Sequence, residues 1–177
     1  NLTVVMSAVP SALVDLCTKA VSATGLVPIV AEPSINAVAR VIEATEEGHL
    51  STLIVDIGPA STDIAVLDKG AIRVTGGIGL GGNTFTLDIA KKLNIALENA
   101  HQLKVLNGLS AGPRQANISA PLKPSLQRII AEVRKVIRYY NERLNDDRKI
   151  EQVLIVGGGV NVSGFGEYFS FELVMAV

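Results

Sequence analysis

The chain has 177 residues, of which 48% are hydrophobic and 19% charged, a composition that excludes a disordered protein. Sixteen Lys and Arg residues against 17 Asp and Glu residues exclude a globally basic nucleic-acid binder, and one cysteine excludes an intrachain disulfide. No uninterrupted apolar run approaches the roughly 20 residues of a membrane-spanning helix, so the apolar residues are expected to form a core.

The first 48 residues predict a small α/β unit. Residues 2–8 and 26–31 are apolar and rich in β-branched side chains, which predicts two strands. Helical spacing predicts one helix over residues 11–25, with Cys17 on its buried side, and a second over residues 32–48. The pattern then changes, and we place a boundary near residues 47–51.

The remainder predicts a β-meander followed by helices and one more strand. Strands are expected at residues 52–57, 62–67, 71–75 and 151–156, and helices at residues 84–93, 95–106, 122–145 and 164–170. Residues 110–121 are rich in turn formers and predict a loop or an edge hairpin. Residues 171–177 have the composition of a strand.

The segment DIGPASTD, residues 56–63, lies between two predicted strands. A tight turn there can direct successive backbone N–H groups into one concavity that suits a phosphate, and Ser61 and Thr62 add hydroxyl donors. Asp56, at the end of the strand, can hold a magnesium ion through its water ligands. The same residues also fit an ordinary hairpin whose polar side chains satisfy the turn.

Glycines cluster at two further turns. VLIVGGG, residues 153–159, is a strand with glycines at its carboxyl end, where a flat ligand can approach the backbone, although a plain turn with positive φ explains it equally well. Gly81 and Gly82 precede a predicted helix, and we interpret Asn83 or Thr84 as its N-cap.

Together these segments resemble the second domain of the actin, Hsp70 and sugar-kinase superfamily. The stretches LIVDIGPASTDIAVLDKGAIRVTGGIGLGGNTFTLDIAKKLNI and VLIVGGGVNVSGFGEYF are most similar to the type IV pilus assembly family PilM, a relative of FtsA, and residues 2–43 also look PilM-like. The resemblance implies an α/β fold of the actin-like, ribonuclease H-like ATPase class. The superfamily's other D-x-G hairpin has no counterpart here, so we expect an incomplete fold that lacks the N-terminal phosphate-1 half.

The resemblance also implies two parts. Residues 1–48 correspond to the end of a first domain, namely a 1C-like α/β piece and the helix that returns to the core. Residues 49–177 correspond to the second nucleotide-binding domain, with a 2A-like core at 49–82 and 146–177 and a 2B-like helical insertion at 83–145. Whether the chain is an excerpt of a longer protein is left open.

ATP and Mg²⁺ are the cofactors that the resemblance implies. Asp56 matches the acid that lies near the metal and holds it through water. The other matches are the positions around the terminal phosphates (Gly58, Ser61, Thr62), the glycines under the nucleoside (Gly157, Gly158, Gly159), a lysine near the adenosine (Lys104) and, through a short Hsp70-like element, a catalytic acid near the attacking water (Glu32).

Three residues depart from the family pattern. Pro59 and Ala60 replace two glycines of the hairpin, and Pro59 removes one N–H donor to phosphate. His101 stands where relatives often have Glu, which weakens the expected ribose contact. With one D-x-G hairpin, we expect the isolated chain to be at most a weak ATPase.

Three functions stay open at this stage. The leading one is a PilM-like adaptor, cytoplasmic and peripheral at the inner membrane without a transmembrane segment, which binds the cytoplasmic tail of a PilN-like membrane protein and no nucleic acid. The others are a self-associating FtsA- or MreB-like filament protein and an ATPase or kinase of the same superfamily. A kinase needs a catalytic base and a substrate pocket, and the sequence reveals neither.

Overall fold

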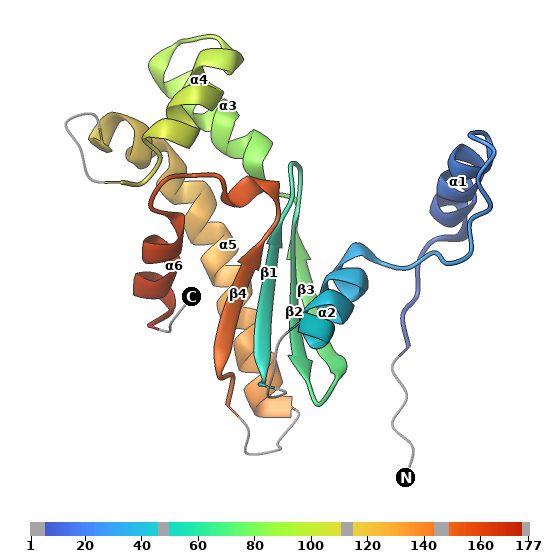
Figure 1. Ribbon diagram of the computed structural model, residues 1–177. Helices are drawn as coiled ribbons and strands as arrows, with labels where there is room; N and C mark the ends of the chain where they lie inside the picture. The colour runs from blue at the N-terminus through green and yellow to red at the C-terminus, as the bar shows by residue number, and fades with distance from the viewer. Residues whose placement is uncertain (1–5, 46–49, 111–114, 144–148, 175–177) are drawn as a thin grey trace.

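A computed structural model describes residues 6–45, 50–110, 115–143 and 149–174 of the chain (Figure 1). Its elements follow in the order α1 (Ser11–Ser22), α2 (Ser34–Thr45), β1 (Thr52–Ile57), β2 (Thr62–Asp68), β3 (Ala71–Ile78), α3 (Gly82–Leu93), α4 (Leu97–Leu106), α5 (Gln115–Arg143), β4 (Gln152–Val156), the 3-10 turn η1 (Gly158–Val160) and α6 (Phe165–Leu173). Most of the elements predicted after residue 51 therefore form close to their expected bounds.

The strands form one sheet in the order β3-β2-β1-β4. β1, β2 and β3 are antiparallel neighbours, as the meander predicts, and Asp56 pairs directly with Asp63 across the first turn. β4 joins the other side of β1 in parallel, with Asp56 opposite Val156. Because β1 and β4 run in the same direction, the turns that follow them leave the sheet at the same edge.

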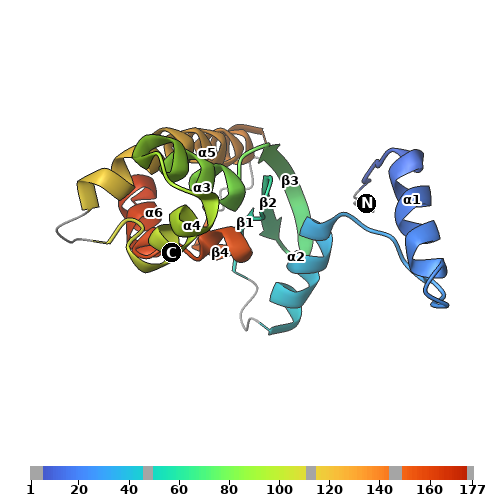
Figure 2. The ribbon, with the colours of Figure 1, turned by 90° about the horizontal axis from the view of Figure 1, so that it is seen from above.

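β1 is the centre of the sheet and is buried on both faces, which explains its continuous apolar sequence. Leu53, Val55 and Ile57 pack in one cluster with apolar side chains of α3, α5 and α6, whereas Ile54 packs on the opposite face against α2. Figures 1 and 2 show α5 and α2 on opposite sides of the sheet. Full burial of each of these side chains contributes roughly 1.5–3 kcal/mol.

Helix α5 begins earlier than the turn-rich sequence predicts. The prediction of a loop or hairpin over residues 110–121 is wrong for its described second half, because α5 already covers it and includes Pro121 and Pro124. Ile118 and Leu122 extend the buried apolar stripe of the helix through this region. Their burial offsets the loss of the two backbone hydrogen bonds that the prolines cannot donate.

The strands predicted before residue 48 are not formed in the described part of the chain. Residues 26–31 contain no strand, and neither do residues 6–8. A strand needs a hydrogen-bonded neighbour, and both views place α1 and the segments around it away from the sheet. Because α1 lies away from the sheet, it buries none of its residues. Cys17, which was predicted to be buried, is therefore exposed.

Parts of several predicted elements lie outside the described residues. These are residues 2–5 of the first strand, 46–48 of the second helix, 111–114 of the loop, 144–145 of the long helix and 175–177 of the last strand. The described beginning of that last strand instead continues α6, where Leu173 packs against the core. The boundary near residues 47–51 falls partly in the same gap, and the division into domains stays a prediction.

The contact between β3 and α5 gives a test of this packing. A Cβ atom on Gly76 would lie 2.5 Å from Cγ2 of the buried Val136, whose branched side chain has little freedom to move aside. We expect Gly76→Ala to lower the free energy of unfolding by about 1–3 kcal/mol, the usual cost of overpacking a core. Gly79→Ala, where a Cβ meets no atom within 4 Å, is the matched control. Urea denaturation measures both variants, and equal losses would contradict the packing argument.

Candidate functional site

The turn between β1 and β2 is closed by its own backbone. The Gly58 N–H donates to the Ser61 carbonyl at 2.9 Å. The Ser61 side chain is exposed, so its hydroxyl can reach a ligand. Thr62 is buried, and its Oγ1 donates to the Leu80 carbonyl at 2.7 Å. Of the two predicted hydroxyl donors, Thr62 is therefore engaged in tying the hairpin to the loop that precedes α3.

The first turn of α3 rests on the hairpin. The Gly82 N–H donates to the Gly58 carbonyl at 3.0 Å, and the Asn83 N–H donates to the Pro59 carbonyl at 2.8 Å. The prediction that Asn83 or Thr84 caps this helix is wrong, because the N-cap is Gly81 and no side chain bonds there. Carbonyl groups of the hairpin satisfy the free N–H groups of the helix instead.

The triple-glycine turn after β4 contacts both of these segments. Gly157 has a φ of +93°, and a Cβ atom there would lie 2.5 Å from the Ile57 carbonyl oxygen. A Cβ on Gly159 would lie 2.7 Å from the same oxygen, and one on Gly82 would lie 3.2 Å from the Gly159 Cα. The three turns thus meet backbone to backbone, at a distance that only glycines allow. Gly158, by contrast, is exposed and has no atom within 4 Å of its Cβ position.

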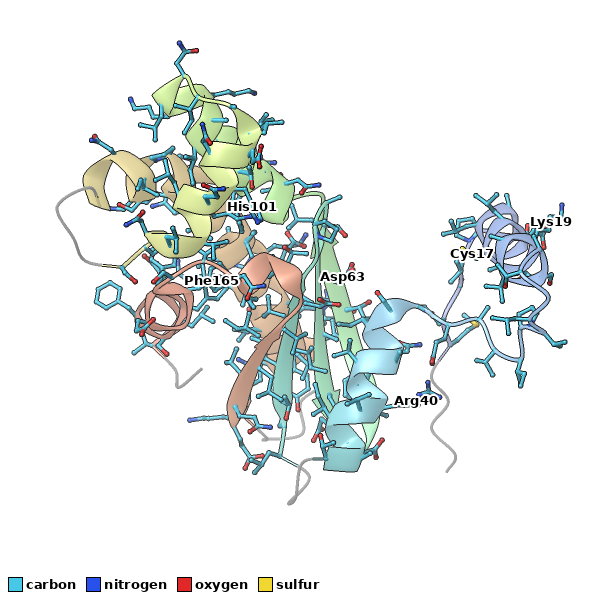
Figure 3. All side chains as sticks on the ribbon, turned by 45° about the horizontal axis from the view of Figure 1, so that its top comes forward. Cys17, Lys19, Arg40, Asp63, His101 and Phe165 are labelled. Atoms are coloured by element: carbon cyan, nitrogen blue, oxygen red, sulfur yellow. The ribbon has the colours of Figure 1, made fainter. Side chains whose placement is uncertain are left out.

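Two carboxylates lie together beside these turns. Asp56 and Asp63 are opposite each other on neighbouring strands. Burial raises the pKa of the Asp56 carboxyl, and the charge of Asp63 raises it further. Figure 3 shows Asp63 at the end of the sheet that lies below α3. Asp63 is not among the predicted site residues, although the tight hairpin fixes the register that places it opposite Asp56.

Lys104 reaches the site from α4. Only 5% of its surface is exposed. Its Nζ donates to the Gly82 carbonyl at 3.1 Å and to the Thr86 hydroxyl at 3.0 Å, and burial lowers its pKa. The predicted adenosine lysine is thus close to the glycine turns, and its donors serve the first turn of α3. His101, on the same helix, is exposed.

Glu32 lines a hollow that includes Asp63 and none of the residues of the glycine turns. It precedes α2 and forms an ion pair with Arg40. Glu32 and Asp63 line the same hollow of about 550 Å³, whose other walls are α1 and residues 28–35. The predicted catalytic acid therefore shares this hollow with Asp63, and its own charge is compensated by Arg40.

Comparison with known proteins gives a family match over most of the chain. The family model described as cell division protein FtsA matches residues 53–173. The chain belongs to the FtsA family. FtsA of Neisseria meningitidis serogroup B is 41% identical over 66 residues, which are 37% of this chain and 16% of that protein. FtsA of Agrobacterium fabrum is 33% identical over 96 residues, which are 52% of this chain and 21% of that protein.

Solved structures confirm the predicted α/β actin-like fold. The PilM-PilN type IV pilus biogenesis complex has a TM-score of 0.75 and 25% identity, and the match covers 92% of this chain and 45% of that chain. MreB5 of Spiroplasma citri bound to ADP has a TM-score of 0.75 and 21% identity, with 93% of this chain and 59% of that chain covered, and shows the fold alone. This FtsA-family chain spans about half of the length of these two solved chains. In its described part, no helix is long and apolar enough to cross a membrane.

Two groups at the turns of this FtsA-family chain are accessible to a ligand: the backbone of Gly158, where a Cβ atom would meet no atom within 4 Å, and the exposed hydroxyl of Ser61. No group of three or more His, Cys, Asp or Glu among the described residues could hold a metal ion by itself. A divalent ion beside Asp56 and Asp63 would therefore take its other ligands from phosphate oxygens and water.

The carboxylate pair predicts that removing the charge of Asp56 stabilises the fold, by an amount that depends on pH. The pKa of Asp56 is raised above 3.8, so the stability that its protonated form contributes is complete below pH 3.8 and is lost as the pH rises through the raised pKa. We expect Asp56→Asn to raise the free energy of unfolding at neutral pH by about 0.2–1 kcal/mol, the range of a cross-strand pair.

Urea denaturation of the two proteins at neutral pH and below pH 3.8 measures this difference, which should vanish at the lower pH. Asp15→Asn, on the exposed α1, is the control and should change little at either pH. A gain that persists in acid would show that the charge of Asp56 is not its cause.

Proposed function

We propose that this chain binds ATP with Mg²⁺ at the three glycine turns and acts as a nucleotide-dependent adaptor of the PilM type. The observation that carries the proposal is the contact of Gly58, Gly82 and Gly159, which brings three turns together beside Asp56 and leaves Gly158 open. Backbone N–H groups in such turns bind anions without any cationic side chain.

Each residue would have a distinct role. Ser61, with its exposed hydroxyl, would contact the terminal phosphates, and Gly58, whose N–H closes the turn, would lie beside them. Asp56 would hold the magnesium ion through water, and residues 157–159 would lie under the nucleoside. Bound ATP would supply a charged phosphate chain whose presence or loss changes the electrostatic field at the hairpin. Thr62 fixes the hairpin through its bond to Leu80, so it supports the turn from inside.

We expect occupancy rather than turnover to be the signal. These 177 residues would contact the nucleotide from one side. The acid proposed for water activation, Glu32, is paired with Arg40. Negligible ATP hydrolysis by the isolated chain is therefore part of the proposal, and steady-state hydrolysis above background would reject it.

We further propose that the hollow between α1 and residues 28–35 receives part of the cytoplasmic tail of a PilN-like inner-membrane protein. Its lining is mostly apolar and includes Leu13, Val14 and Val30, which suits a short apolar segment. The likeness to the PilM-PilN complex over 92% of the chain supports this partner and a cytoplasmic position at the membrane.

The alternative is a self-associating filament protein, which the matches to FtsA support equally well. Filaments of an actin-like protein sediment at high speed when ATP is added, whereas an adaptor stays in the supernatant and captures its peptide. Sedimentation of the longest available protein with and without ATP therefore separates the two functions.

Nucleotide binding is tested by a substitution that the fold tolerates. Gly158→Ala adds a methyl group where no atom lies within 4 Å, so the stability should change by less than about 0.5 kcal/mol. The same methyl group occupies the face proposed for the nucleoside, so the affinity for Mg-ATP should fall by about tenfold or more. Calorimetric titration measures the affinity, with Asp56→Ala as a second variant. Equal affinities of the three proteins would contradict the proposed site.

Peptide docking is tested by substituting one valine and one leucine on the same helix, α1. Val14→Asp places a charge inside the hollow, and we expect it to weaken binding of a fluorescent PilN-like tail peptide by about tenfold or more. Leu16→Asp places the same charge on the same helix, at a side chain that does not line the hollow. Fluorescence anisotropy measures both, and similar affinities of the two variants would place the peptide elsewhere.

A further inference from the structure

Lys104 carries a buried charge that the proposed nucleotide contacts do not explain. An ammonium group is costly to remove from water unless hydrogen bonds replace its hydration. Lys104 donates to the Gly82 carbonyl and to the Thr86 hydroxyl, and that hydroxyl donates to the same carbonyl at 3.1 Å. Ammonium, hydroxyl and carbonyl therefore form a closed set of hydrogen bonds between α4 and the first turn of α3.

Gly82 is held at both ends. Its N–H donates to the Gly58 carbonyl in the hairpin, while its own carbonyl accepts from Lys104. The Cβ position of Gly82 lies 3.2 Å from the Gly159 Cα and 3.7 Å from the Lys104 Nζ. One glycine thus joins α4 to both turns of the candidate site.

From these contacts we propose that Lys104 is a positioning residue, which acts through Gly82 to fix the hairpin turn and does not itself touch the ligand. The proposal rests on the proposed function only in taking this turn as the phosphate site.

A direct contact between Lys104 and a nucleoside is the competing explanation. An ammonium group has three N–H donors, and two of them are already used by Gly82 and Thr86. The exposed fraction of the residue is 5%, which leaves little surface for a ligand. The Lys104 side chain therefore supports the glycine turns without contacting the ligand.

Amide hydrogen exchange in the absence of nucleotide tests this role. Lys104→Met keeps the length of the side chain and removes its donors. We expect exchange of the Gly82 and Asn83 amides to accelerate by about tenfold or more, while the Ile64 amide in β2 keeps its rate. Lys91→Met, the same substitution at an exposed position of α3, is the control and should leave the Gly82 and Asn83 amides unchanged.

Two results would overturn the proposal: unchanged exchange at Gly82 and Asn83 in Lys104→Met, or an equal acceleration in β2, which would indicate a general loss of stability. Thr86→Val is the milder variant if Lys104→Met does not fold. It removes the hydroxyl that bridges Lys104 and Gly82, and should accelerate the same amides.

A separate titration with Mg-ATP distinguishes failure of this proposal from failure of the proposed function. If the wild-type chain does not bind Mg-ATP, the proposed function is wrong, whereas local acceleration of exchange still supports the positioning role. If Lys104→Met weakens Mg-ATP binding and leaves the exchange of the ligand-free chain unchanged, Lys104 contacts the ligand directly and the positioning role is wrong.

Discussion

The candidate site depends on one constraint, the direct contact between backbones at three turns. A Cβ atom on Gly159 would collide with the Ile57 carbonyl oxygen, and one on Gly82 would lie 3.2 Å from the Gly159 Cα, which is closer than a usual contact. The polar groups exposed by this approach are satisfied across the contact, since α3 donates its first N–H groups to carbonyls of the hairpin. The same hydrogen bonds therefore cap the N-terminus of α3 and join it to the hairpin.

The sheet supplies the rigidity that this contact needs. β1 is buried by α5 on one face and by α2 on the other, and it carries the hairpin at one end. At that end the apolar sequence is followed by Asp56. Partial burial and the like charge of Asp63 both destabilise the charged form of its carboxyl group. The chain thus places a mutually repulsive pair where a cation is expected, and the apolar core offsets its cost, a common relation between stability and function.

Much of this arrangement could be predicted from local patterns. The sequences of β1 and β2 indicated the sheet, and the glycines after β4 indicated the edge at which the turns lie. The apolar stripe of α5 indicated the helix that packs on one face. Contacts distant in sequence could not be predicted in the same way. The capping of α3 by hairpin carbonyls, the burial of Lys104 and the helical conformation around Pro121 depend on tertiary neighbours, and the strand expected at residues 26–31 lacks a neighbour to pair with.

The pairing of β1 with β4 has a consequence for how the protein is made. Thr52 and Gln152, which are 100 residues apart, lie side by side and share a hydrogen bond. The strands of the meander contact their sequence neighbours, and α3 contacts α4, so these elements can form while the chain is still leaving the ribosome. The third glycine turn arrives only with residues 157–159, and such non-local pairing is slow to form. A nascent chain therefore remains without a complete candidate site until nearly all of these residues have been synthesised.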